Sequence, residues 1–368
     1  MSLSCGIIGL PNVGKSTLFN CLTSANVQSD NYPFCTIEPN IGIVNVPDKR
    51  LEALAKIVKS KQIKPATISF IDIAGLVKGA NKGDGLGNKF LNHIRDVNAI
   101  CHLVRCFENE NIIHVNEKTD PIHDIYIVDT ELILADYDTV LKNFNRNKKN
   151  VVNHLKKDKE VILFYEKILE HLNKSKPART FKYDKNNNEL KNCFYNMHLL
   201  SSKPTLFIAN VDEDTMLGKS NIHLNAIKKL AKKKGEKVII ICAKIENELS
   251  KLNYKDRIDF FKNLNIKDSG LQKIIKASFK LLNLRTYLTA GSTEVKAWTF
   301  KKNTTAPQAA GIIHSDFERG FIKADVINYE DFIKYNGEPG CRQAGAIKLE
   351  GKDYIVKDGD IIHFKFNV

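Results

Sequence analysis

One eight-residue segment near the start constrains this chain more than any other. Residues 9–16 read GLPNVGKS and fit the pattern G-x-x-x-x-G-K-S. The short apolar run before it, residues 3–8, predicts a buried parallel strand, and residues 16–22 predict the helix that follows. A phosphate-binding loop needs this strand–loop–helix context, which argues against a chance glycine turn. The segment therefore predicts a site for a nucleoside triphosphate.

Each residue type in the loop has a chemical reason. Gly9 and Gly14 allow the backbone N–H groups to converge on a β-phosphate at the positive end of the helix. Lys15 supplies a point charge to the β- and γ-phosphates, and the Ser16 hydroxyl is a ligand for Mg²⁺. The nucleotide-binding residues predicted from this segment are Asn12, Val13, Gly14, Lys15, Ser16 and Thr17.

Two further motifs indicate a nucleotide hydrolase with switch segments. Asp72 and Gly75 form a D-x-x-G element directly after the apolar run 68–71. Asp72 is expected to hold Mg²⁺, and the Gly75 amide to reach the γ-phosphate. Thr36 lies in a polar, proline-punctuated stretch between the two motifs, where a switch threonine would bind Mg²⁺ when the γ-phosphate is present. The predicted Mg²⁺ ligands are Ser16, Thr36 and Asp72.

The segment expected to read the base departs from the guanine-specific pattern N-K-x-D. Residues 210–213 read Asn-Val-Asp-Glu, with Val211 in place of the lysine and Glu213 in place of the aspartate. A longer acidic side chain crowds the guanine amino group, so guanine preference should be lost and adenine accepted. The apolar run 238–241 leads into a Cys-Ala-Lys loop that would pack on the base. The predicted base contacts are Asn210, Val211, Glu213, Cys242 and Ala243.

Composition narrows the class of protein and its partners. The 368 residues carry a net charge of +14, and lysines crowd segments 146–159 and 228–237. Such runs are often solvated helix faces, but on a nucleotide-handling protein they also suit RNA. No apolar run approaches a membrane span, no signal peptide is evident, and the eight cysteines include no C-x-x-C pair. We therefore expect a cytoplasmic protein without membrane or DNA partners.

Taken together, these motifs resemble those of the Obg-like ATPases, the YchF subfamily of translation-factor-related P-loop proteins. The likeness extends over essentially the whole chain, and its departures are Cys242, where serine is common, and lysine- and asparagine-rich helices. The resemblance implies an α/β fold: a P-loop G domain with a mixed, mainly parallel sheet, an inserted helical coiled-coil domain, and a C-terminal TGS domain of β-grasp shape. It also implies hydrolysis of ATP in preference to GTP, and association with the ribosome. The boundaries that we assign are 1–118 and 201–284 for the G domain, 119–200 for the insertion and 285–368 for the TGS domain.

The residue pattern supports this organisation independently. Asp72 and Asn210 are too far apart for one strand–helix–strand step, so a subdomain must interrupt the G domain. Apolar stripes between them predict two helices in an antiparallel hairpin, with helices packed flat on the G domain as the alternative. Beyond the helix predicted near 271–282, five short strands alternate with one helix around 309–319, as in a β-grasp fold.

Catalysis must use groups other than the glutamine of many related hydrolases, because Leu76 and Val77 follow Gly75 and neither can orient water. Besides Lys15 and Gly75, Asn12 is a candidate, since an asparagine there helps related enzymes to bind K⁺ beside the phosphates. The resemblance also points to His114 as a mobile group that reaches the water, although a lone histidine is more often structural.

Two other functions fit the same residues. One is a GTP-specific GTPase of ribosome assembly, which differs from the ATPase only in base recognition. The other is a nucleotide-gated scaffold with negligible turnover that binds RNA or protein. In all three cases Mg²⁺ is the expected cofactor, with K⁺ as a second one, and the large ribosomal subunit or its RNA is the expected partner.

Overall fold

A computed structural model describes residues 3–24, 40–73, 85–109, 119–150, 156–252, 256 and 268–367. The chain forms two compact units, and neither is continuous in sequence. The first comprises residues 1–42 and 69–274, and the second residues 43–68 and 275–368. No helix within the described residues is both long and apolar enough to cross a membrane.

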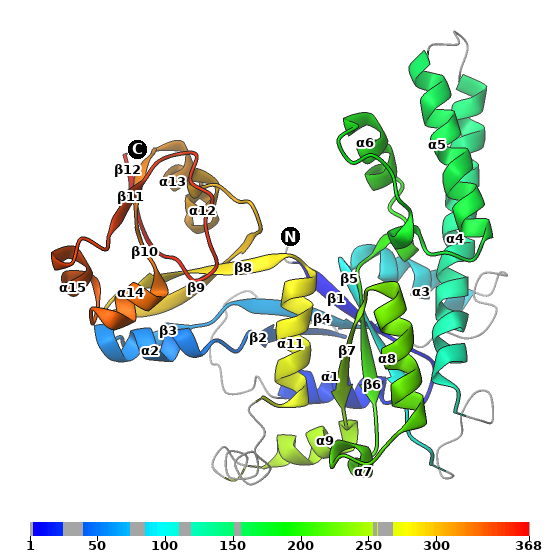
Figure 1. Cartoon of the computed structure of the whole chain (residues 1–368), viewed down its shortest axis with the longest axis horizontal. Coiled ribbons are helices and arrows are strands. Elements are labelled where there is room, and N and C mark those ends of the chain that lie inside the picture. Colours follow the sequence, from blue (N-terminus) through cyan, green and yellow to red (C-terminus); the bar gives the residue numbers. More distant parts are fainter. Residues whose placement is uncertain are drawn as a thin grey trace. The chain divides into compact units, whose positions relative to one another are not determined.

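The first unit is built on a six-stranded sheet in the order β2-β4-β1-β5-β6-β7 (Figure 1). β1 pairs in parallel with β4 and β5, and β6 pairs in parallel with β5 and β7. All residues of β1, β5 and β6 are buried, which explains why these strands read as almost continuous apolar runs. The division between the units passes through β2 and β4. The strands are β1 Ser4–Ile8, β2 Ile41–Asn45, β4 Thr67–Asp72, β5 Ala99–Arg105, β6 Thr205–Asn210 and β7 Lys237–Ile241.

Helices pack around this sheet, and two of them form the predicted hairpin. α4 and α5 lie side by side (Figure 1), with Val140, Phe164 and Ile168 in one shared core. The first turns of α4 instead pack on the sheet with α8, where Ile125 joins Phe207 and Ile227. One long helix therefore combines both arrangements that the sequence left open. The helices are α1 Lys15–Ser24, α3 Gly85–Asp96, α4 Pro121–Asn150, α5 Lys156–Asn173, α6 Asn188–Asn196, α7 Glu213–Met216, α8 Ile222–Lys234 and α9 Ala243–Lys251, with short 3₁₀ turns at η2 Ala178–Thr180 and η3 Leu200–Ser202; α11 Gly270–Leu281 spans the division.

A buried network of ion pairs joins α4 to η2 and to the end of α8. Arg179, in η2, binds Asp129 of α4 at 3.2 Å and Glu236 at 2.6 Å. Lys234, at the end of α8, binds the other oxygen of Asp129 at 2.7 Å. Burial would raise the pKa of Asp129, but Arg179 and Lys234 outweigh it and lower that pKa, so the carboxylate stays ionised. Removing one member of this network would leave a buried charge unpaired, which is costly. The intact network therefore holds α4, η2 and α8 together.

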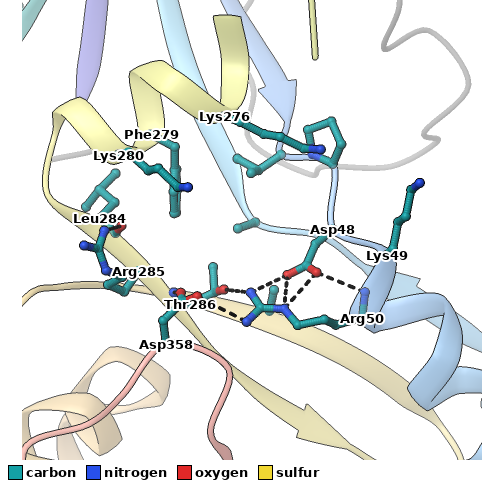
Figure 2. Close-up of a pocket in the computed structure, with 14 residues that line it drawn as sticks. Asp48, Lys49, Arg50, Lys276, Phe279, Lys280, Leu284, Arg285, Thr286 and Asp358 are labelled. Atoms are coloured by element: carbon teal, nitrogen blue, oxygen red, sulfur yellow. Dashed lines mark hydrogen bonds and ion pairs between the residues drawn. The ribbon is translucent and has the colours of Figure 1, made fainter. Parts of the chain in front are cut away.

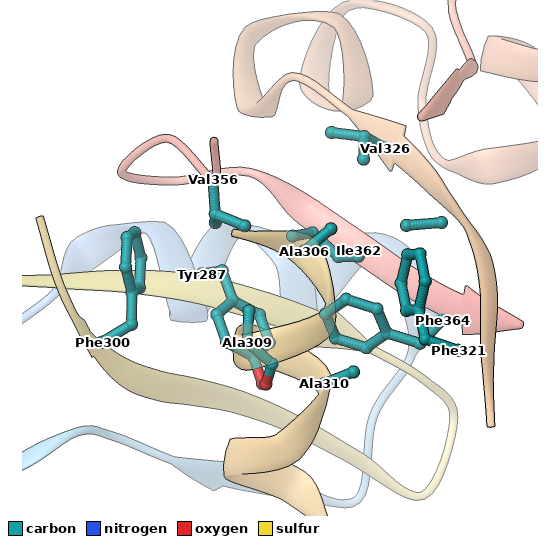
Figure 3. Close-up of a cluster of buried hydrophobic side chains, with 11 residues drawn as sticks. Tyr287, Phe300, Ala306, Ala309, Ala310, Phe321, Val326, Val356, Ile362 and Phe364 are labelled. Atoms are coloured by element: carbon teal, nitrogen blue, oxygen red, sulfur yellow. The ribbon is translucent and has the colours of Figure 1, made fainter. Parts of the chain in front are cut away.

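The second unit is a separate six-stranded sheet in the order β11-β10-β12-β8-β9-β3. Asp48 caps the N-terminus of α2 and also holds the Arg50 guanidinium (Figure 2). The core gathers around Tyr287, whose hydroxyl donates to the Ala309 carbonyl at 2.9 Å and whose ring meets Phe364 edge to face (Figure 3). The elements are α2 Lys49–Val58, β3 Gln62–Lys64, β8 Leu284–Ala290, β9 Glu294–Lys301, α12 Ala306–Ile313, α13 Ser315–Arg319, β10 Phe321–Ile327, α14 Tyr329–Lys334, α15 Glu338–Gln343, β11 Lys348–Glu350 and β12 Ile361–Phe366.

The five predicted strands of this unit are confirmed, whereas its helices and its boundaries differ from the prediction, and the short helices α14 and α15 were not predicted. The single helix expected around 309–319 is two helices, because His314 is extended at φ −158° and caps α13 through its side chain. Residues 43–68, which the sequence assigned to the G domain, group by contacts with residues 275–368. β3 pairs in parallel with β9, a long-range pairing that no local pattern announces.

The insertion offers a stability test at Asp136, a buried residue of α4. Its carboxylate accepts hydrogen bonds from the N–H groups of Leu200 and Ser201 and from the Ser201 hydroxyl, at 2.6, 2.7 and 2.6 Å. Burial nevertheless raises the pKa of Asp136 to about 6 from 3.8. The stabilisation from its protonated form is therefore present below about pH 4 and lost as the pH rises through 6. Between pH 4 and pH 7, the free energy of unfolding of the wild type should fall by roughly 2 kcal/mol relative to Asp136→Asn.

Urea unfolding followed by helical circular dichroism measures this difference. Asp138→Asn is the matched control, because Asp138 is exposed on the same helix. A constant difference between wild type and Asp136→Asn across that pH range would contradict the assignment.

Candidate nucleotide-binding site

The loop between β1 and α1 has the backbone shape that a phosphate requires. Asn12 and Gly14 adopt positive φ values of 62° and 96°. A Cβ on Gly9 would lie 2.4 Å from the Leu103 carbonyl oxygen, so no side chain fits there. α1 begins directly after the loop, with the Leu18 N–H donating to the Gly14 carbonyl at 3.0 Å. The first amides of the helix therefore point out of the loop toward a bound anion.

The Asn210 side chain joins the phosphate loop to the segment after β7. Its Nδ2 donates to the Val13 carbonyl at 3.0 Å, and its Oδ1 accepts from the Ala243 N–H at 3.0 Å. Asn210 itself is buried. A Cβ on Gly14 would lie 2.9 Å from the same Nδ2. The glycine thus serves close packing of the loop against Asn210 as well as its positive φ.

Lys15, Ser16 and Asp72 meet at the phosphate end of the site. The Ser16 hydroxyl lies near the Asp72 carboxylate and opposes the rise in its pKa. Burial raises the pKa of Asp72, opposed by Lys15, while burial lowers the pKa of Lys15, opposed by Asp72. The two charges lie close enough to stabilise each other, and the Lys15 ammonium also donates to the Leu10 carbonyl at 3.4 Å.

This donor set fits a magnesium ion. The buried Oδ1 of Asp72 accepts no hydrogen bond from any described residue. A buried carboxylate oxygen without a donor is costly, and a cation would satisfy it. A hydroxyl and a carboxylate are the hard oxygen ligands that Mg²⁺ takes beside the phosphates. Ser16 and Asp72 are therefore suited to hold it.

At the base end, two charged side chains face each other across the segments after β6 and β7. Glu213, the first residue of α7, binds Lys244 of α9 at 2.6 Å, and both are partly exposed. The hydrogen bond from Lys244 lowers the pKa of Glu213. Val211, the other residue that departs from the guanine-specific pattern, is buried in the core. Of Val211 and Glu213, it is therefore Glu213 that faces solvent. Cys242 and Ala243 are also buried, and Cys242 precedes α9 as its N-cap.

Three predicted site residues lie outside the described residues: Thr36, Gly75 and His114. The rest come together in the first unit, on the loops that follow β1, β4, β6 and β7. Carboxyl ends of parallel strands meet at one edge of a sheet, which is why distant motifs form one site.

Sequence reasoning missed Arg105 at the end of β5. Its guanidinium is buried, donates to the carbonyls of Phe107 and Asn109 at 3.0 and 3.2 Å, and lies 4.7 Å over the Phe107 ring. These bonds fix the chain where it leaves the sheet beside Asn210, the strand partner of Arg105. The signal was present in the sequence: a single arginine closes an otherwise uncharged, mostly apolar strand.

Fold and site together define a P-loop nucleoside triphosphatase. The comparisons with known proteins agree with this class. A family model described as a 50S ribosome-binding GTPase matches residues 4–211, and the model YchF-GTPase_C, described as a protein of unknown function, matches residues 284–367. The chain belongs to the YchF family, because full-length relatives of that family share half of its residues.

Two relatives and one solved structure document this membership. The ribosome-binding ATPases YchF of Bacillus subtilis and Haemophilus influenzae are each 51% identical over 100% of both chains. The structure of the Schizosaccharomyces pombe YchF GTPase superposes with a TM-score of 0.89 at 38% identity, covering 99% of this chain and 98% of that one. The bacterial proteins are named ATPases and the yeast protein a GTPase, so the names leave the choice of purine open.

The packing of Gly14 generates a direct test. Gly14→Ala would force a Cβ against Asn210 at a φ of 96° and displace the loop, so Mg²⁺-nucleotide affinity should fall by about 100-fold or more. Gly218→Ala is the matched control, since Gly218 has a similar φ of 102° with no atom within 4 Å of the added Cβ. Isothermal titration calorimetry measures both. Equal affinity in the two variants would show that close packing at Gly14 is not required.

Proposed function

We propose that this protein is a Mg²⁺-dependent ATPase that acts as a molecular switch on the ribosome. The observation that carries the ATP assignment is the Glu213–Lys244 ion pair at 2.6 Å. In guanine-specific sites a free carboxylate accepts from two donors on the guanine edge. Here the carboxylate is longer by one methylene and is already engaged by an ammonium group. Adenine presents no such pair of donors, so its binding loses no hydrogen bonds at this position.

Phosphate binding is assigned to the loop and its lysine. The amides of residues 13–17 and the Lys15 ammonium bind the β- and γ-phosphates, and they stabilise the charge that moves toward the β–γ bridging oxygen during hydrolysis. Mg²⁺, when bound, neutralises charge on the β- and γ-phosphates. Ser16 and Asp72 would hold it, with Thr36 as a third ligand. The Gly75 amide is assigned to the γ-phosphate.

Positive charge and water positioning come from less usual groups in this proposal. Asn12 has a positive φ of 62° and is exposed at the rim of the loop, where its side chain can help to hold K⁺ beside the phosphates. His114 is proposed to approach the attacking water. Val13, Thr17, Asn210, Cys242 and Ala243 shape the pocket, Val211 contributing through the core beneath it.

The domain assignment remains part of the proposal. Residues 119–200 are taken as the coiled-coil insertion, on the strength of the α4–α5 hairpin. Residues 285–368 are taken as the TGS domain, whose mixed sheet, with helix α12 packed into its core, suits a β-grasp. The G domain comprises the remaining residues, 1–118 and 201–284.

Ribosome association is supported by charge as well as by family. The bacterial relatives carry ribosome binding in their names. In α8, Lys234 is used in the buried network, whereas Lys228, Lys229, Lys232 and Lys233 are exposed. Exposed lysines on one helix suit the phosphates of ribosomal RNA. A cytoplasmic location is part of the same proposal.

A GTP-specific GTPase is the second candidate, favoured by the name of the yeast relative. A scaffold with negligible turnover differs only in rate. Single-turnover hydrolysis with and without ribosomes separates a switch from a scaffold, and the titrations below separate the two purines.

ATP should bind at least as tightly as GTP to the wild type. Shortening Glu213 to aspartate should free the carboxylate from Lys244 and shift the ATP/GTP affinity ratio toward GTP by about fivefold or more. Asp214→Glu is the control, since Asp214 pairs with Lys219 at the surface. A strong GTP preference in the wild type by calorimetric titration would overturn the ATP assignment.

Replacing Na⁺ by K⁺ should raise the steady-state rate of ATP hydrolysis, because K⁺ adds positive charge beside the transferring phosphoryl group. Asn12→Ala should lose this stimulation, and Asn20→Ala, at an exposed position of α1, should retain it. Equal rates in the two salts for all three proteins would exclude a role for K⁺.

Co-sedimentation with the large ribosomal subunit should depend on the bound nucleotide and weaken steeply with salt, since phosphate contacts release counterions. The double variant Lys228→Gln/Lys232→Gln should reduce the salt slope by about two, one for each contact. Binding that does not change with salt would indicate a protein partner in place of RNA.

A further inference from the structure

The second unit contains a cavity that the nucleotide chemistry does not use. Its volume is about 350 Å³, within the range of small-molecule sites. All of its lining residues belong to residues 43–68 and 275–368, so it lies within one compact unit. The walls come from the start of α2, from α11, and from β8 and β9, with Asp358 from the loop before β12 (Figure 2).

Five cationic side chains line this cavity and two carboxylates oppose them. The cations are Lys49, Arg50, Lys276, Lys280 and Arg285, and the carboxylates are Asp48 and Asp358. The formal balance is therefore 5 − 2 = +3. Lys276 and Lys280 lie four residues apart on α11 and therefore on the same face of that helix.

Both carboxylates are already committed to one cation. The Arg50 guanidinium binds Asp48 at 2.7 Å and Asp358 at 3.2 Å, and donates to the Thr286 hydroxyl at 3.0 Å. Burial would lower the pKa of Arg50, but these carboxylates outweigh it and raise that pKa. A Cβ on Gly359 would lie 2.5 Å from the guanidinium, so glycine is what permits this close packing. Arg50 is thus a fixed wall of the cavity.

The excess positive charge lies on the opposite wall. Lys280 is exposed, and Arg285 is partly exposed with one of its donors on the neighbouring Leu284 carbonyl. Figure 2 shows both side chains on the side of the cavity away from Arg50 and its carboxylates. A guanidinium and an ammonium that line one cavity are the kinds of donor that bind a phosphate group.

The remaining lining is apolar. Phe279, Leu284 and Ala297 are each buried, and they contribute hydrocarbon surface between the two charged walls. A bare inorganic ion would leave this surface wet. A ligand with an organic part next to its phosphate would cover it.

We propose that this cavity binds a small phosphate monoester, with its phosphate on Lys280 and Arg285 and its organic part on the apolar wall. The volume of the cavity suits one small molecule. The site is separate from the phosphate loop, so it would give the protein a second ligand independent of the proposed ATPase activity.

Phenyl phosphate is the probe, titrated by calorimetry into the full chain whose phosphate loop is saturated with Mg²⁺ and a non-hydrolysable ATP analogue. Saturable binding at one site is expected, weakened by salt. Lys280→Gln and Arg285→Gln should each weaken it about tenfold. Lys302→Gln, an exposed lysine of the same unit outside the cavity, should leave it unchanged.

Phenol and inorganic phosphate separate the two parts of the proposed ligand. Phenol should not bind measurably, and inorganic phosphate should bind about tenfold more weakly than phenyl phosphate. Three results would overturn the proposal: no saturable binding, equal loss in the Lys302→Gln control, or displacement only by an RNA oligonucleotide that lacks a terminal phosphate. None of them bears on ATP hydrolysis, which is measured separately.

Discussion

One buried amide side chain holds the candidate site together. Asn210 donates to the phosphate loop at Val13 and accepts from the base-side segment at Ala243, at 3.0 Å in each case. It can do so because Ala209 and Val211 turn into the core under α4 and α8, which places Asn210 on the other face of the sheet. Gly14 then fits against its amide only without a Cβ. Asn210 thus links the phosphate loop directly to the segment that is proposed to contact the base.

The second constraint is the placement of the positively charged side chains. A net charge of +14 would favour unfolding by self-repulsion if it were concentrated in the interior. In the described part of the chain, several cations that are largely withdrawn from solvent pair with carboxylates, as Arg179 and Lys234 do with Asp129 and the half-buried Arg50 does with Asp48 and Asp358. Other lysines, such as those along α8, remain at the surface, available to a polyanion.

The sequence predicted most of what depends on local pattern. The phosphate loop, Asp72 and Asn210 were predicted from motifs, because the glycine positions and the apolar runs before the motifs leave few alternative structures. The break at His314 was missed, since a helical pattern continues across it and only the side-chain cap reveals the turn. α6 was not predicted, because a polar segment precedes it and only the side-chain cap of Asn187 marks its start.

Contacts between distant residues were the least predictable part. Arg179 looks like any surface arginine in sequence, yet it is buried between Asp129 and Glu236. Residues 43–68 group with the C-terminal unit through the pairing of β3 with β9 and through the bonds of Arg50. Both contacts join segments that are over 200 residues apart in the sequence, so no local pattern predicts them. Glu213 was recognised from its motif, whereas its partner Lys244 required the loop geometry.

The most direct test of this account is Asn210→Ala, followed by nucleotide titration and by hydrogen exchange of the backbone amides. The Ala243 amide should lose protection, and the affinity for Mg²⁺-ATP should fall at least about tenfold, because two buried backbone groups lose their partner. Asn210→Asp, which keeps an acceptor for the Ala243 amide, should retain that protection. Wild-type affinity and unchanged protection of Ala243 in Asn210→Ala would contradict the central role of this side chain.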